Sequence, residues 1–114
     1  MINMNIDEDE KRVYIKVGGF ISKKEATNFL NTYKQTIKSK KSSLYKLVVS
    51  PSFFECEDEN DIRTVCMTFL KTGYKKIYIV DEDNYIMNNL SLNPIEKKLF
   101  LKSVKIVDTI RAIK

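Results

Sequence analysis

Three segments predict how this chain folds: LYKLVV (Leu44–Val49), ECEDEND (Glu55–Asp61) and KIYIV (Lys76–Val80). The first and the last are apolar enough to be β-strands, and the middle segment is an acidic loop. Between the loop and the second strand, apolar residues recur at helical spacing: Ile62, Val65, Cys66, Phe69 and Leu70. A helix between two strands is the usual connection in a parallel sheet. The stretch therefore predicts two parallel strands joined by a helix.

Upstream of these segments, the sequence predicts a β-hairpin followed by a helix. Apolar and polar residues alternate in Ile2–Ile6 and again in Val13–Val17, with a charged turn between them. The pair Gly18-Gly19 breaks this alternation, so we expect the second strand to end there. The motif Ser22-Lys-Lys-Glu25 matches a capping box, and one apolar stripe follows it to about Ser39.

Two residues mark further boundaries in the central stretch. Pro51 predicts the end of the strand Leu44–Val49, because proline cannot donate a backbone hydrogen bond. Gly73 fits the position just after the helix, where a left-handed backbone is common. The strand Lys76–Val80 is apolar on both faces, so we expect it in the interior of the sheet.

The C-terminal third gives a less regular pattern. We expect a helix in Tyr85–Leu92 and another that starts at Pro94. In the second of these helices, three apolar residues are predicted to face inward: Ile95, Leu99 and Phe100. The pattern then predicts a strand, Val104–Val107, and a short terminal helix capped by Asp108.

The length of 114 residues fits one domain, so residues 1–114 are predicted to form a single unit. The order of the segments predicts the α/β class. We expect a mixed, mostly parallel sheet of about five strands, with an N-terminal β-hairpin and helices packed on the sheet.

Composition excludes several kinds of function. The chain has no histidine, which removes Ser-His-Asp and Cys-His catalysis and histidine-based metal sites. The two cysteines, Cys56 and Cys66, have no CxxC spacing, and unpaired thiols fit a reducing compartment such as the cytoplasm. The first nine residues lack the pattern of a signal peptide, and no apolar run is long enough to span a membrane. We expect no cofactor.

Five carboxylates lie close together at the predicted start of the second helix: Glu55, Glu57, Asp58, Glu59 and Asp61. They have two functional interpretations, a docking surface for a basic partner or a weak Ca²⁺ or Mg²⁺ site. The structural interpretation, which we favour, is that carboxylates at a helix start complement the helix dipole. The same carboxylates should raise the pKa of the Cys56 thiol and suppress its reactivity.

Phe53 and Phe54 precede this acidic cluster. Two adjacent aromatic residues cannot easily both point inward, so one could fill the core while the other is exposed. Exposed aromatic residues near charges are typical anchors of protein interfaces. The alternative is that both rings pack under the loop.

The net charge is +5, and 17 of the 20 basic residues are lysines. Two groups of lysines could form basic patches: Lys34, Lys38, Lys40, Lys41 and Lys46, and Lys97, Lys98, Lys102 and Lys105. Binding of nucleic acid needs such residues to converge, and specific base contacts favour arginine, of which there are three. Because the acidic segment would also repel phosphate, we interpret the lysines as solvated helix faces.

The chain resembles the STAS superfamily, the domain of bacterial anti-sigma-factor antagonists. The resemblance rests on VYIKVGGFIS (Val13–Ser22), KLVV (Lys46–Val49), KKIYIV (Lys75–Val80) and VKIVDTIRA (Val104–Ala112). It implies a STAS-like fold and a regulatory role. Phosphorylated members carry a Ser or Thr where the third strand leads into the next helix. The corresponding residues here, Phe54–Asp61, contain neither, so the resemblance implies that the phosphorylation switch is absent and that the carboxylates could imitate a phosphorylated state.

These observations favour a non-enzymatic regulatory or scaffolding module that binds another protein. The predicted partner-binding residues form one continuous segment: Phe53, Phe54, Glu55, Glu57, Asp58, Glu59 and Asp61. The alternative is binding of nucleic acid or an anionic surface through the lysines. An enzyme that uses carboxylates alone would need a paired acid and base in a pocket, and the sequence shows no such pair.

Overall fold

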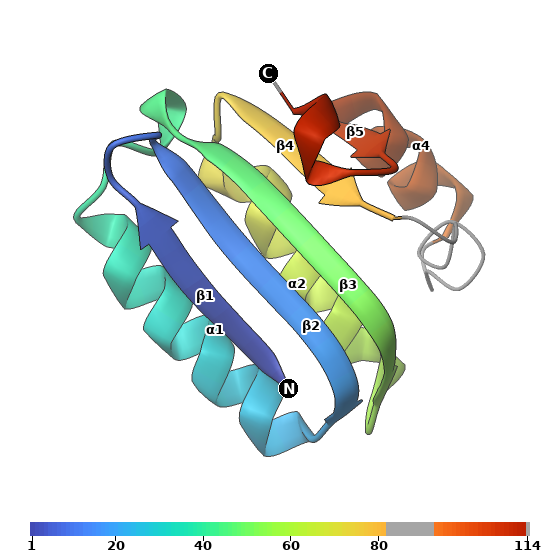
Figure 1. Cartoon of the computed structure of the whole chain (residues 1–114). Coiled ribbons are helices and arrows are strands. Elements are labelled where there is room, and N and C mark those ends of the chain that lie inside the picture. Colours follow the sequence, from blue (N-terminus) through green and yellow to red (C-terminus); the bar gives the residue numbers. More distant parts are fainter. Residues whose placement is uncertain (82–92, 114) are drawn as a thin grey trace.

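Figure 1 shows the computed structural model, which describes residues 1–81 and 93–113. The five strands form one sheet in the order β1-β2-β3-β4-β5. The strands are β1 (Ile2–Asp7), β2 (Arg12–Ile21), β3 (Lys46–Cys56), β4 (Lys76–Val80) and β5 (Val104–Val107). β1 is antiparallel to β2, and every other neighbouring pair is parallel. The predicted mixed sheet with an N-terminal hairpin is therefore confirmed.

Two long helices, α1 (Lys23–Lys38) and α2 (Glu59–Thr72), cover the same face of the sheet (Figure 1). α2 connects β3 to β4, which confirms the predicted parallel unit. α4 (Pro94–Ser103) leads into β5 at the far edge. Single 3₁₀ turns precede β3 at Ser42–Leu44 and follow β5 at Ile110–Ala112.

The main core lies between the sheet and the two long helices. Leu47 and Ile79 of the sheet belong to this core, together with Phe69 of α2. Tyr78 points to the opposite face, where Ile113 near the C-terminus covers it. β4 is thus an interior strand buried on both faces, as predicted. Among the described residues, its second face is covered by the segment around Ile113.

α1 is attached to the hairpin at both of its ends. Ser22 caps the helix, and its hydroxyl accepts a hydrogen bond of 3.1 Å from the Glu25 amide. The Glu25 carboxylate does not complete the predicted capping box, because it accepts a hydrogen bond from the Ile2 amide at the edge of β1. Beyond the other end of α1, Lys40 forms an ion pair with Glu8 in the hairpin turn. The helix is therefore fixed along the outer edge of the sheet.

The predicted ends of the second and third strands were wrong. β2 continues through Gly18 and Gly19 to Ile21, and β3 continues through Pro51 to Cys56. Proline is tolerated in this part of β3 because the register with β4 ends at Val49, which leaves the proline nitrogen outside that ladder. Pairing between β2 and β3 extends each strand beyond the glycine or proline residues that would end it in isolation.

The C-terminal predictions were partly correct. Val104–Val107 is a strand and α4 starts at Pro94, but only Phe100 of the three predicted inward residues is buried. Ile95 is 81% exposed and Leu99 is 51% exposed, because α4 presents a single residue to the core. The last turn is capped by Thr109, whose hydroxyl accepts from the Arg111 amide at 2.9 Å, and not by Asp108. The helix predicted in residues 85–92 lies outside the described residues.

None of the helices in the described part of the chain combines the length and the hydrophobicity that a membrane span requires.

Candidate protein-binding site

The segment Phe53–Asp61 runs from the second half of β3 into the first turn of α2. The observed loop is shorter than the predicted loop Glu55–Asp61, because Glu55 and Cys56 belong to β3 and α2 already begins at Glu59. The carboxyl ends of β2 and β3 meet the start of both long helices here (Figure 1). In open α/β sheets, this end of the parallel strands is where ligands usually bind.

A β-bulge in β3 determines where the two phenylalanines point. Val17 pairs with Pro51 and Gly19 pairs with Phe54, so two residues of β3 lie opposite the single residue Gly18. A Cβ atom on Gly18 would come within 2.4 Å of the Ser52 hydroxyl, so the glycine leaves room for this hydroxyl to donate to the Val17 carbonyl at 3.2 Å. A bulge shifts the alternation of side chains by one residue. It therefore turns Phe54 toward the helices.

The two adjacent rings have opposite environments. Phe54 is 7% exposed and belongs to the main core, whereas Phe53 is 68% exposed. This arrangement is the first of the two alternatives that the sequence left open. Because Phe54 is buried, only Phe53 can present its ring to a partner, and Phe54 supports the segment from below.

Phe20 adds a second exposed aromatic ring that the sequence did not single out. It is 60% exposed and pairs with Glu55, which lies two residues after Phe53 on the same face of β3. The Met1 side chain, 52% exposed, is nearby, since the Met1 amino group donates hydrogen bonds to the Gly18 and Phe20 carbonyls. We call Met1, Phe20 and Phe53 the apolar patch. The sequence feature that could have identified Phe20 is an aromatic residue directly after two glycines.

Lys23, at the start of α1, contacts much of the acidic cluster. Its ammonium group lies 3.3 Å from the Asp58 carboxylate and 3.7 Å from that of Asp61. Its backbone amide donates to the Glu57 carboxylate at 3.5 Å, and the Glu57 amide donates to the Ile21 carbonyl. No pattern in the sequence singled out Lys23, although the Ser22 cap places it in the first helical turn. Lys23 links the starts of α1 and α2.

Asp58 has the structural role that we favoured for the carboxylates, because its side chain lies at the start of a helix. It is the N-cap of α2, and its carboxylate accepts from the Asn60 amide at 3.0 Å. That backbone hydrogen bond, followed by the bond from Lys23, lowers the pKa of the Asp58 carboxyl below its ordinary value. Asp61 is largely buried, and its Oδ2 atom has no hydrogen-bond partner among the described residues.

The other carboxylates remain on the surface. Glu55 and Glu59 are exposed, and neither forms an ion pair with any residue that the structure describes. Glu57 is exposed as well, so the three side chains add negative charge to the segment that follows Phe53. No group of three metal-binding side chains occurs within residues 1–81 and 93–113. The site is therefore an apolar patch beside a surface of negative charge.

Neither cysteine has the environment of a reactive thiol. Burial raises the pKa of the Cys56 thiol, and the nearby Asp61 charge raises it further. The predicted direction is confirmed, although burial and not the carboxylates is the larger cause. Burial also raises the pKa of Cys66 to about 12. Both thiols stay protonated at neutral pH, so neither is an activated nucleophile.

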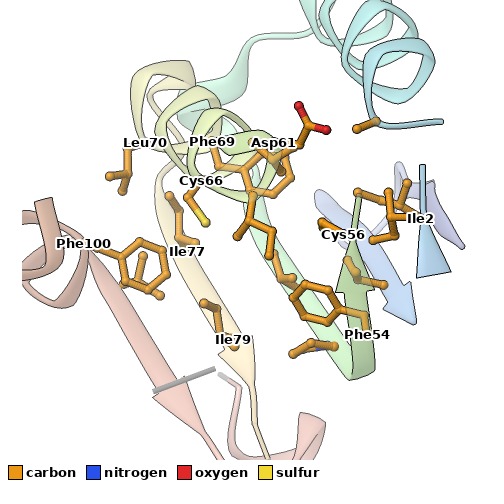
Figure 2. Close-up of a pocket in the computed structure, with 18 residues that line it drawn as sticks. Ile2, Phe54, Cys56, Asp61, Cys66, Phe69, Leu70, Ile77, Ile79 and Phe100 are labelled. Carbon is orange, nitrogen blue, oxygen red and sulfur yellow. The ribbon is translucent and has the colours of Figure 1, made fainter. Parts of the chain in front are cut away.

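An apolar cavity of about 70 Å³ lies below the segment, between the sheet and α2. Figure 2 shows Phe54, Cys56 and Cys66 among the side chains that surround it. Asp61 lies at one end of the lining (Figure 2), and its carboxylate is held by Lys23. The cavity therefore offers contacts with carbon and sulfur and almost no hydrogen bonds.

The two groups of lysines do not converge. Lys34 and Lys38 lie on α1, which packs against β1 at one edge of the sheet, whereas Lys97, Lys98 and Lys102 lie on α4 at the opposite edge (Figure 1). Within the first group, Lys40 is neutralised by Glu8. A nucleic-acid site that uses both groups would need to reach across the whole sheet.

Comparison of the sequence with known family models and with curated proteins finds no match. Comparison with solved structures does. The anti-sigma factor antagonist SpoIIAA in its unphosphorylated form is similar, with a TM-score of 0.60 over 97% of this chain and 91% of that one, at 8% sequence identity. The chain has a SpoIIAA-like fold.

A second solved structure supports the same conclusion. It is an uncharacterised protein of the DUF3478 family from Shewanella loihica PV-4, described as having a SpoIIAA-like fold. Its TM-score is 0.65 over 97% of this chain and 87% of that one, at 10% identity. The STAS-like fold that the sequence implied is therefore confirmed.

The SpoIIAA-like fold also gives a context for the start of α2. The resemblance placed a phosphorylated hydroxyl of related domains where the third strand leads into the next helix. In this chain the helix is capped by Asp58, and the residues around it contain no Ser or Thr between Phe53 and Asp61. In this chain a carboxylate, that of Asp58, lies at the start of the helix.

Proposed function

We propose that this domain is a non-enzymatic regulatory or scaffolding module that binds another protein through the segment Phe53–Asp61. The observation that carries the proposal is the exposed ring of Phe53 on a β-bulge, beside the exposed ring of Phe20. Large aromatic residues that are both exposed and adjacent are typical of interaction sites, because they offer much apolar area at little cost in side-chain entropy.

The surrounding charge supports a particular type of partner. The exposed side chains of Glu55, Glu57 and Glu59 follow Phe53 closely in the sequence, whereas the protein as a whole has a net charge of +5. A basic surface on the partner would be attracted to this end of the sheet and repelled by the rest of the molecule. Local charge of this kind governs orientation and association rate more than final affinity.

The SpoIIAA-like fold supports a role in regulation by protein contact. The similar structure is that of an anti-sigma factor antagonist, and we extend to this chain only the general idea of a regulatory protein partner. The protonated thiols of Cys56 and Cys66 fit a reducing compartment, so we place the protein in the cytoplasm.

Affinity purification from the native cells tests the proposal. The bait is the full chain, compared with Phe53→Ala and Phe20→Ala. Leu44→Ala is the matched control, because Leu44 is 54% exposed and precedes β3 at the opposite end of that strand. We expect one or more proteins to be lost with each phenylalanine variant and retained with Leu44→Ala. Retention of every partner by the double variant Phe20→Ala/Phe53→Ala would refute the proposed surface.

Charge reversal tests whether the exposed carboxylates contribute to partner binding. Glu55→Lys combined with Glu59→Lys should reduce capture of the same partner, because it repels a basic surface. Asp9→Lys combined with Glu10→Lys, at two exposed residues of the hairpin turn, is the control with the same change in net charge. Equal effects of the two changes would indicate that overall charge, and not this segment, governs binding.

A further inference from the structure

We infer that the apolar cavity beneath α2 is a binding site for a small apolar molecule, independent of whether the segment Phe53–Asp61 binds a protein. Eighteen of the residues that the structure describes line the cavity, and of these all except Cys56, Cys66 and Asp61 have apolar side chains. Protein interiors are normally packed as densely as organic crystals, with few voids larger than a water molecule. A volume of about 70 Å³ is well above that size.

The walls of the cavity come from several elements that hold one another in place. Ile77 and Ile79 lie on one interior strand, and Phe69 lies on the facing helix (Figure 2). Val65 belongs to the same helix and also lines the cavity. The helix is fixed at its start through Lys23 and at its end through Thr72, whose hydroxyl is bonded to Tyr33 at 2.8 Å. Both ends of α2 are thus joined to α1, and β4 is held between β3 and β5, so a shift of α2 alone would break these contacts.

The lining also determines the chemistry of the occupant. Water is stable in a cavity only when it finds two to four polar partners. Asp61 lies at one end of the cavity (Figure 2), where its Oδ1 faces Lys23 at 3.7 Å and its Oδ2 has no hydrogen-bond partner among the described residues. The other polar atoms of the described lining are the sulfurs of Cys56 and Cys66, whose raised pKa keeps them protonated, so a water molecule would find fewer than two strong partners. A hydrophobic molecule without hydrogen-bonding groups therefore matches the cavity better than water does.

The volume limits the size of that molecule. A dry apolar cavity of about 150 Å³ is known to hold benzene or xenon. A cavity of about half that volume suits a xenon atom or a hydrocarbon of about three or four carbons. The proposed ligand class is therefore small apolar molecules of the size of cyclopropane.

The experiment uses the full chain, with xenon and cyclopropane as probes, and follows the methyl resonances by NMR. We expect saturable shifts for Val65, Leu70 and Ile79, which line the cavity. Val48 and Val107 belong to the core cluster on the opposite face and should show no saturable change. Shifts that grow linearly with probe concentration at all methyl groups would overturn the proposal.

Two matched variants test the location. Val65→Ile adds one methylene inside the cavity, whereas Val80→Ile adds the same group on the opposite face. We expect Val65→Ile to weaken probe binding severalfold, Cys66→Leu to abolish it and Val80→Ile to leave it unchanged. Equal affinity in Val65→Ile and Val80→Ile would overturn the assignment, and this comparison stands even if Cys66→Leu does not fold.

Discussion

The two halves of β3 differ in every respect that matters for function. Lys46–Val49 is paired with β2 on one side and β4 on the other, and Leu47 and Val48 are completely buried. The half from Pro51 to Cys56 lies beyond the register with β4 and contains a proline, a bulge and an exposed phenylalanine. One strand thus provides the centre of the core with its first half and the candidate site with its second.

The difference shows how a sheet can present a side chain without losing its core. Regular alternation would have directed Phe53 and Phe54 to fixed faces set by the first half of the strand. The bulge opposite Gly18 resets the alternation, so that Phe54 returns to the core directly after Phe53 leaves it. The site depends on a local irregularity that the buried half of the strand does not need.

The largest effect is expected for Phe54→Ala. Removing a ring that is 7% exposed leaves a cavity, and such truncations cost about 3 to 5 kcal/mol of unfolding free energy. Urea denaturation followed by circular dichroism measures this loss. A loss below about 1 kcal/mol would show that the second half of β3 is not part of the core.

A smaller effect is expected for Gly18→Ala. The added Cβ atom would meet the Ser52 hydroxyl at 2.4 Å and turn it away from the Val17 carbonyl, and loss of such a hydrogen bond costs about 1 kcal/mol. Ser52→Ala removes the same hydrogen bond, so the double variant should lose little more stability than either single variant. A double-mutant cycle by urea denaturation measures the coupling. Additive losses would mean that Gly18→Ala does not act through this hydrogen bond.

The start of α2, to which the second half of β3 leads, should make stability depend on pH. Asp58 has a pKa below its ordinary value of 3.8, so its charge stabilises the fold above that pH and the stabilisation is lost as the pH falls through the lowered pKa. Asp58→Asn keeps a capping side chain but has no charge. The melting temperature of the wild type should exceed that of Asp58→Asn at pH 6 and approach it at pH 2. A constant difference would contradict the role of the charge.

The smallest effect on stability is expected for Phe53→Ala. The ring is 68% exposed, and surface substitutions usually change the free energy of unfolding by less than about 0.5 kcal/mol. The same denaturation assay should therefore separate this variant from Phe54→Ala clearly. Equal losses for the two variants would remove the distinction between an exposed and a supporting ring.

The sequence predicted the regular parts of the fold because local periodicity carries that information. The alternation in the hairpin, the apolar stripes of α1 and α2, and the two apolar strands around α2 each repeat over enough residues to be recognised. Ser22 and Gly73 marked helix ends correctly, because capping depends on a few neighbouring residues.

The irregular parts depend on partners distant in sequence, and local patterns could not predict them. Pro51 ends an isolated strand, but here pairing with β2 carries β3 past it. Lys23 meets Asp58 only because the parallel connection brings the starts of α1 and α2 together. The candidate site was located from its carboxylates and aromatic residues, whereas the burial of Phe54 and the contribution of Phe20 required the sheet register.

The attachment of α1 along β1 has a consequence for how molecules of this protein meet. An outermost strand with unpaired backbone groups invites strand addition from a second molecule, and proteins usually obstruct it. Glu25 occupies the outward-facing amide of Ile2, and the ion pair of Lys40 with Glu8 holds the other end of the helix beside the hairpin. These contacts obstruct the addition of a strand from a second molecule to β1, and they thereby disfavour the continuous sheets that form fibrils.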